Sequence, residues 1–222
     1  YEIRLSLVGS EMCIRDSYTT PWDNYLVHSG VWTYDDSRVL GRIGYVPIEE
    51  YCFFVLQSYL TGLWCFFMQK RIAVISPPHV GKNVAYWTGI IFLLGLLGLG
   101  IVSARSESGR YMSLILLWAT PVALMQWMIG GRTLVRNWRL YSVCLVPPTL
   151  YLWIIDAYAI ANGVWSISTT QTVGLNIGIM PLEEMLFFLM TNVMLCQGLI
   201  LFIALRSEYP QVYARLKLKA VA

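Results

Sequence analysis

Charged residues are scarce in this chain. Only 13% of its 222 residues are Asp, Glu, Lys or Arg, whereas 57% are hydrophobic. Soluble domains contain about 25% charged residues, so the composition excludes an ordinary soluble domain and indicates a membrane protein. The net charge is only +3, and no basic stripe with interleaved aromatic residues occurs in the sequence. Nucleic acid is therefore not an expected partner.

Motifs for metals and common cofactors are missing as well. The five cysteines include no C-x-x-C pair, which argues against a zinc site and a disulfide framework. The sequence contains neither a G-x-G-x-x-G segment after a strand nor the spacing of a P-loop. No Lys falls inside a long apolar run, which excludes a retinal Schiff base. We therefore expect no cofactor and no metal ion.

Long apolar runs dominate what is present. A helix that spans a membrane needs about 20 mostly apolar residues, and residues 18–32 resemble the end of such a helix. Five complete runs meet the criterion: about 48–68, 85–104, 111–130, 139–161 and 181–205. The sequence thus predicts an all-α, polytopic transmembrane helical bundle with about six spans.

Residues 1–17 do not fit this pattern. They resemble the peptide produced when a sequencing adapter is translated, and we interpret them as an artefact rather than a polar leader. They also lack the apolar region of a signal peptide. The fold prediction therefore concerns residues 18–222 as one membrane domain.

A motif pair occurs twice. D-x-Y, four residues and G-V-W begin at Asp23 and again at Asp156, an offset of 133 residues. I-G-x-x-P-[IL]-E-E-x-x-F-F begins at Ile43 and again at Ile177, an offset of 134 residues. One inserted residue accounts for the difference, so the chain contains an internal repeat, with one copy in 18–68 and the other in 139–205.

The basic residues indicate the direction of the repeats. Successive loops lie on alternate sides of the membrane. One side has loops 33–46, 105–110 and 162–180, and the other has loops 69–84, 131–138 and the tail. The first set carries Arg38, Arg42, Arg105 and Arg110, whereas the second set carries or adjoins Lys70, Arg71, Lys82, Arg132, Arg136, Arg139, Arg206, Arg215, Lys217 and Lys219. The positive-inside rule places the second set in the cytosol. Equivalent helices of the two copies are separated by four membrane crossings, so they run in the same direction. This predicts two parallel repeats about an axis along the membrane normal.

Acidic residues inside apolar runs are the candidate catalytic groups. Pro followed by two Glu is also an ordinary helix start, and a lone intramembrane Asp can be a structural hydrogen-bonding residue. Repetition at one register favours function, because ionisable residues at membrane depth are costly. The candidates are Glu49, Glu50, Glu183, Glu184, Asp23 and Asp156.

Aromatic residues accompany the acids. Each Glu has a Phe four residues later, on the same helix face, and each Asp has a Tyr two residues later. The candidate substrate-binding residues are Phe53, Phe54, Phe187, Phe188, Tyr25 and Tyr158. We expect Trp32 and Trp165 at the membrane interface rather than in the site.

Together these groups suit proton-initiated chemistry on an apolar substrate. Burial and close like charges both disfavour ionised carboxylates, so at least one acid in each cluster is expected to keep a proton for general acid catalysis. Aromatic faces stabilise a carbocation by cation–π attraction.

The motifs resemble the lycopene cyclase domain, which fungi fuse to phytoene synthase and some bacteria and archaea encode as separate subunits. The segments that carry the resemblance are Pro21-Trp22-Asp23-Asn24-Tyr25, Pro47-Ile48-Glu49-Glu50 with Phe53-Phe54, Tyr151 to Asp156, and Pro181-Leu182-Glu183-Glu184 with Phe187-Phe188.

The resemblance implies an integral, multi-pass membrane enzyme of carotenoid synthesis, with seven spans in the intact family. Its implied reaction converts the ψ-ends of lycopene to β-rings, through γ-carotene to β-carotene. The implied partners are these carotenoids in the lipid phase, membrane lipid, and a fused or associated phytoene synthase. The chain is then either a fragment of a bifunctional enzyme or a cyclase alone.

Three alternatives remain at this point. Repeated intramembrane acids also suit a proton-coupled transporter, although Phe and Leu follow each acid pair instead of a polar path. Other carotenoid or terpenoid chemistry would use the same groups. A membrane scaffold would leave the repeated acids unexplained.

Overall fold

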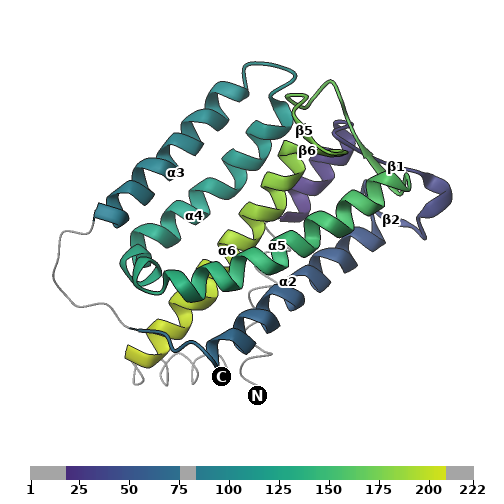
Figure 1. Cartoon of the computed structure of the whole chain (residues 1–222). Coiled ribbons are helices and arrows are strands. Elements are labelled where there is room, and N and C mark those ends of the chain that lie inside the picture. Colours follow the sequence, from purple (N-terminus) through teal and green to yellow (C-terminus); the bar gives the residue numbers. More distant parts are fainter. Residues whose placement is uncertain (1–18, 76–83, 209–222) are drawn as a thin grey trace, which may run out of the picture.

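A helical bundle forms the body of the protein in the computed structural model, which describes residues 19–75 and 84–208 (Figure 1). The proposed artefact, residues 1–17, lies outside the described residues. After a helical segment at 19–28, the long helices are α2 (Ile48–Gln69), α3 (Val84–Ser103), α4 (Arg110–Arg136), α5 (Trp138–Ala161) and α6 (Leu182–Glu208). Within the described ranges, five helices are long and apolar enough to cross a membrane. The predicted helical class and all five complete spans are therefore confirmed.

Helix α6 lies at the centre of the bundle. It packs against α2, α4 and α5, while α3 lies outermost and packs against α4 (Figure 1). Glycines allow the close approach of α3 to α4, since a Cβ atom at Gly89 would lie 2.3 Å from the Trp127 ring. Half of the most apolar stretch of α6 is buried inside the bundle, which is consistent with a helix that is apolar on nearly all sides.

The predicted loop at 131–138 is mostly helix. Helix α4 continues to Arg136 through a kink at Gly130, where φ is −141° and ψ is 19°. A Cβ atom at Gly130 would lie 2.1 Å from a methyl group of Leu201 on α6, so the glycine permits the kinked helix to pass its neighbour. Gly131 and Leu134 are buried beyond the kink, and this packing outweighs the low helix propensity of the glycines.

Short strands occupy the two repeated loops at one end of the bundle. They are β1 (Trp32–Tyr34), β2 (Arg42–Ile43), β3 (Val46–Pro47), β4 (Trp165–Ile167), β5 (Asn176–Ile177) and β6 (Met180–Pro181), with a 3-10 helix η1 at Asp36–Arg38. Strands β2–β3 and β5–β6 form equivalent hairpins. The turn residues Gly44 and Gly178 both have φ of +66°, a left-handed conformation that favours glycine.

The two copies are related by a pseudo-two-fold axis. Strands β1 and β4, which are equivalent in the repeat, pair with each other in an antiparallel register centred on Thr33 and Ser166. Deeper in the bundle, the equivalent residues Gln57 and Thr191 form a direct hydrogen bond of 2.8 Å. Helices α2 and α6 both start at the strand end and run the same way (Figure 1), so the repeats are parallel, as the loop count predicts.

Candidate active site

A cavity of about 210 Å³ lies beneath the repeated loops. Its walls come from α2, α5 and α6, and its roof from the loops around β1 and β4. The residues that line it are Tyr34, Arg38, Val39, Pro47, Glu49, Glu50, Phe53, Ile155, Asp156, Ala159, Val164, Trp165, Glu184, Phe187 and Phe188. Both copies of the repeat therefore contribute to one cavity.

Three acids from different helices line this cavity. Glu50 stands in the first turn of α2, Asp156 near the end of α5, and Glu184 in the first turn of α6. Glu184 is fully buried and Asp156 is 7% exposed, while Glu50 is half-buried. The fold thus brings Glu50 to the same cavity as two carboxyl groups that lie more than a hundred positions later in the sequence.

The first Glu of each pair has a different environment. Glu49 Oε1 accepts a hydrogen bond of 2.6 Å from the Leu40 backbone N–H, and Glu183 Oε1 accepts one of 2.6 Å from the Val173 N–H. These bonds tie each repeated loop to the start of the helix that follows it. Glu183 does not line the cavity, whereas Glu49 does.

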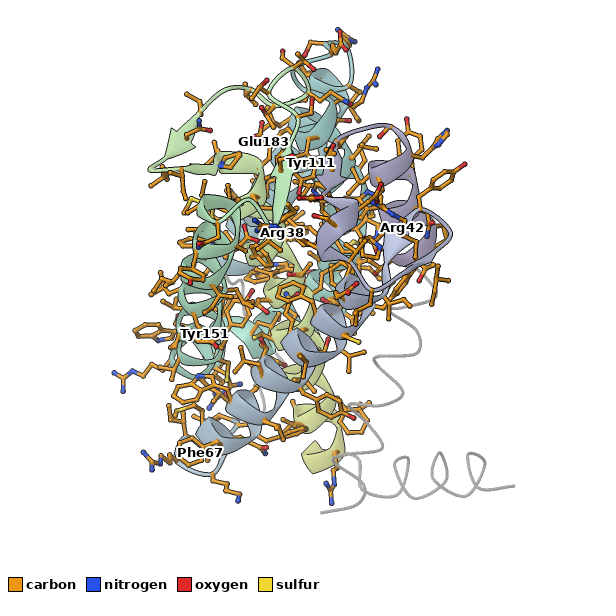
Figure 2. All side chains as sticks on the ribbon, turned by 90° about the vertical axis from the view of Figure 1, so that its right-hand side faces the viewer. Arg38, Arg42, Phe67, Tyr111, Tyr151 and Glu183 are labelled. Atoms are coloured by element: carbon orange, nitrogen blue, oxygen red, sulfur yellow. The ribbon has the colours of Figure 1, made fainter. Side chains whose placement is uncertain are left out.

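Tyr111 connects the cavity to α4. Its hydroxyl donates a hydrogen bond of 2.5 Å to Glu184 Oε2 and accepts one of 3.0 Å from Trp32 Nε1. All three side chains are buried. Figure 2 shows Tyr111 at the same end of the bundle as Glu183 and Arg38, while Phe67 lies at the opposite end.

A second phenol, Tyr34, faces the acids from β1. Burial and the nearby Glu50 carboxylate raise the pKa of Tyr34 well above its ordinary value. The two groups interact electrostatically, although the Tyr34 hydroxyl makes no hydrogen bond of normal geometry within the described structure. Tyr34 therefore remains a neutral O–H group beside the cavity and is unsuited to act as a base.

Aromatic rings surround the acids. Phe53 packs edge-to-face on Phe188, with ring centroids 5.9 Å apart, and the repeat-related pair Phe54 and Phe187 packs in the same way at 6.2 Å. Tyr34 stacks with Trp165 at 6.1 Å. The cavity thus combines carboxyl groups with aromatic faces that attract cations.

Not every predicted site residue reaches the cavity. Phe54 and Asp23 are buried but do not line the cavity. Asp23 lies within electrostatic range of Tyr34. Tyr25 and Tyr158 are 49% and 70% exposed and lie outside the lining. Each of these tyrosines follows a buried Asp by two positions, and residues at that spacing do not share a helix face.

The expectation for the two repeated tryptophans is wrong. Trp32 is 1% exposed and Trp165 is 9% exposed, and their rings meet edge-to-face at 5.7 Å. They lie in the core next to the acids because β1 and β4 pair across the pseudo-two-fold axis. Trp165 lines the cavity, and Trp32 holds Tyr111.

Sequence reasoning did not identify Tyr34 and Arg38, which line the cavity, or Tyr111, which bonds to a lining acid. Tyr111 belongs to α4, which lies between the copies and carries no repeated motif. One signal was present, because Tyr111 and Trp118 are seven positions apart on an apolar helix and so share a face. Both residues are buried in the same core cluster.

Acidic clusters can also bind metal ions. Within residues 19–75 and 84–208, no group of three or more His, Cys, Asp and Glu side chains has an arrangement that could hold one. What the cavity offers is a set of carboxyl groups beside phenols and aromatic faces, which is suited to moving protons on an apolar molecule.

Comparisons with known proteins agree with this chemistry. A sequence model of the lycopene cyclase family matches residues 17–68 and 109–203. The chain is 40% identical over 200 residues to the lycopene beta-cyclase of Halobacterium salinarum, covering 90% of this chain and 83% of that protein. No solved structure matches the chain.

Fungal relatives are longer. The chain is 31% identical to the bifunctional lycopene cyclase/phytoene synthase of Podospora anserina, covering 97% of this chain and 38% of that protein. It is 38% identical to the enzyme of the same name from Aspergillus niger, covering 82% of this chain and 32% of that protein. The matched region therefore spans about a third of each bifunctional relative.

Proposed function

The chain belongs to the lycopene cyclase family, and on that premise we propose that it is a lycopene β-cyclase. It converts the ψ-ends of lycopene to β-rings, through γ-carotene to β-carotene. The observation that carries the proposal is the single cavity in which Glu50, Asp156 and Glu184 face aromatic walls.

The reaction needs only an acid and a base. A protonated carboxyl group delivers its proton to the terminal double bond of the ψ-end, which leaves a tertiary carbocation. The neighbouring double bond attacks this cation and closes the ring. A carboxylate then removes a ring proton and restores a double bond. One proton enters and one leaves, so there is no net redox change, and general acid–base catalysis suffices.

The cavity acids suit these two roles. Four carboxyl groups line the cavity, and they cannot all be ionised at low cost, because burial and like charges both oppose ionisation. We therefore propose that at least one carries the initiating proton while another accepts the ring proton. The faces of Phe53, Phe187 and Phe188 stabilise the cation between the two steps, and exclusion of water prevents its capture.

The size of the cavity supports the cyclisation of one end at a time. At about 30 Å³ for each water-sized group, a volume of 210 Å³ holds roughly seven such groups. That is the scale of a ring-forming end group. A whole carotenoid is comparable in length to the ~30 Å hydrocarbon core of a membrane, so the rest of the chain must lie outside the cavity.

The remainder of the substrate has an apolar route. Among the lining residues, Ile155 on α5 is 42% exposed, and Phe53 on α2 is partly exposed. We propose that the cavity opens sideways between α2 and α5, where these two apolar residues lie. We propose that the carotenoid enters here from the lipid phase.

The setting of the enzyme follows from the same features. Five apolar helices of spanning length support an integral, multi-pass membrane protein. Bifunctional fungal relatives support a fused or associated phytoene synthase as a partner. A proton-coupled transporter is less suited to the site, because the cavity walls are mainly aromatic and aliphatic.

Expression in lycopene-producing bacteria tests the proposal. We expect the red pigment to be replaced by γ-carotene and β-carotene, identified by chromatography and absorption spectra. A matched strain carrying Glu184→Gln at equal membrane levels is the control. Lycopene that remains unchanged in the presence of membrane-inserted wild-type protein would contradict the assignment.

A further inference from the structure

Tyr111 lies outside both copies of the repeat, yet it makes a short hydrogen bond to a cavity acid. It stands in the first turn of α4 and is fully buried. Its hydroxyl joins Trp32 of the first copy to Glu184 of the second copy, with donor–acceptor distances of 3.0 Å and 2.5 Å.

The direction of these two bonds is determined by chemistry. The indole nitrogen of Trp32 is only a donor, so the Tyr111 oxygen must accept from it. The single hydroxyl hydrogen of Tyr111 is then free to point at Glu184. For an ionised carboxylate, Oε2 can only accept this hydrogen. For a protonated carboxyl group the same direction is favoured, because otherwise the hydroxyl hydrogen of buried Tyr111 would have no acceptor within the described structure.

This arrangement distinguishes the two oxygens of Glu184. A proton on Oε2 would leave the hydroxyl hydrogen of Tyr111 without its acceptor, so Oε1 is the favoured position for the proton. Within the described structure, Oε1 is buried and has no hydrogen-bond partner. No group within the described structure competes for this oxygen, and it belongs to a residue that lines the cavity.

We propose that Tyr111, oriented by Trp32, is a positioning residue that keeps the proton of Glu184 on Oε1 and directs it at the end group of the substrate. The inference rests on the proposed cyclase function and deepens it. It makes Glu184 the proton donor and leaves Glu50 and Asp156 as the candidate acceptors of the ring proton.

The test combines turnover with infrared spectroscopy of Tyr111→Phe. This variant removes the hydroxyl and keeps the ring. We expect kcat to fall about 10–100-fold, the effect of losing a hydrogen bond to a group that becomes charged as Glu184 gives up its proton, while KM changes less than about threefold because the cavity shape is kept. Tyr141→Phe is the matched control, since it removes a partly buried phenol that accepts a 3.2 Å bond from Gln197 outside the cavity. It should keep wild-type kcat.

The spectroscopic measurement does not depend on activity. The C=O stretch of protonated Glu184 is identified as the band that disappears in Glu184→Gln. In Tyr111→Phe the carbonyl oxygen loses its donor, so this band should move to higher wavenumber. Fluorotyrosine at position 111 keeps the ring and strengthens the donor. It should move the band to lower wavenumber. This variant replaces Tyr111→Phe in the measurement if the Phe variant accumulates poorly in the membrane.

The outcomes separate the two hypotheses. Full activity of Glu184→Gln would overturn the acid role of Glu184, and with it this inference, while leaving the proposed cyclase function in place. Absence of turnover by the folded wild-type protein would overturn the cyclase function itself. An inactive Glu184→Gln together with wild-type kcat and an unmoved band in Tyr111→Phe would refute only the role of Tyr111. Equal losses in Tyr111→Phe and Tyr141→Phe would likewise refute it, because they would indicate a general effect of removing buried phenols.

Discussion

Glu183 and Glu184 are adjacent in the sequence, and the structure predicts opposite consequences for their substitution. Glu184→Gln keeps the size of the side chain, and its amide oxygen can still accept from Tyr111. It removes the carboxyl proton, however, and losing general acid–base catalysis costs about 10²–10⁴-fold in rate. We therefore expect loss of β-ring formation with normal levels in the membrane.

Glu183→Gln should act mainly on stability. Its Oε1 accepts from the Val173 N–H at 2.6 Å, and an amide oxygen can keep that bond without the strength that charge gives. The difference between charged and neutral hydrogen bonds is about 1–2 kcal/mol. We expect a lower thermal midpoint and a rate within about tenfold of wild type, since Glu183 does not line the cavity.

The assay is turnover of lycopene in proteoliposomes, with products separated by chromatography and rates divided by the amount of folded protein. The first copy should show the same order, with Glu50→Gln more damaging than Glu49→Gln. The contrast should be smaller there because Glu49 also lines the cavity. If Glu183→Gln and Glu184→Gln reduce the rate equally at equal folding, the division of roles between the two acids is wrong.

Three further predictions concern the loops, the opening and the orientation. Gly44→Ala should destabilise the protein more than Gly178→Ala. Both glycines have φ of +66°, where a side chain costs about 1–2 kcal/mol, but only at Gly44 would the Cβ atom lie 2.3 Å from a neighbouring side-chain oxygen. Equal thermal midpoints of the two variants would contradict this. Ile155→Trp should raise KM for lycopene by narrowing the opening between α2 and α5, whereas Ile154→Trp, at a neighbouring position that is 68% exposed and outside the lining, should not. In a cysteine-free background, Thr169→Cys should react with an impermeant maleimide only from the non-cytosolic side, and labelling only from the cytosol would reverse the orientation.

The amino-acid sequence alone was sufficient to predict the helical membrane class, the five complete spans and the parallel repeat. These features depend on the length of apolar runs and on motif spacing, which are local properties of the chain. The repeated acids were also visible, since ionisable residues inside apolar segments are rare.

Tertiary structure decided which of those residues meet. Adjacent residues on a helix point about 100° apart, so the rotation of α6 in the bundle, and not the motif, directs Glu184 into the cavity and Glu183 to the loop at Val173. Tyr25 and Tyr158 lie two positions after a buried Asp on their own helices, about 200° further around the axis, and are therefore exposed.

The repeated motifs do not predict contacts between distant segments. Tyr111 reaches Glu184 only because α4 packs against α6, and Trp32 is buried only because β1 pairs with β4. The repeat predicts two similar halves, but their association around one axis merges them into a single cavity. Helix α4, which lies outside both copies and supplies Tyr111, makes the two halves chemically different.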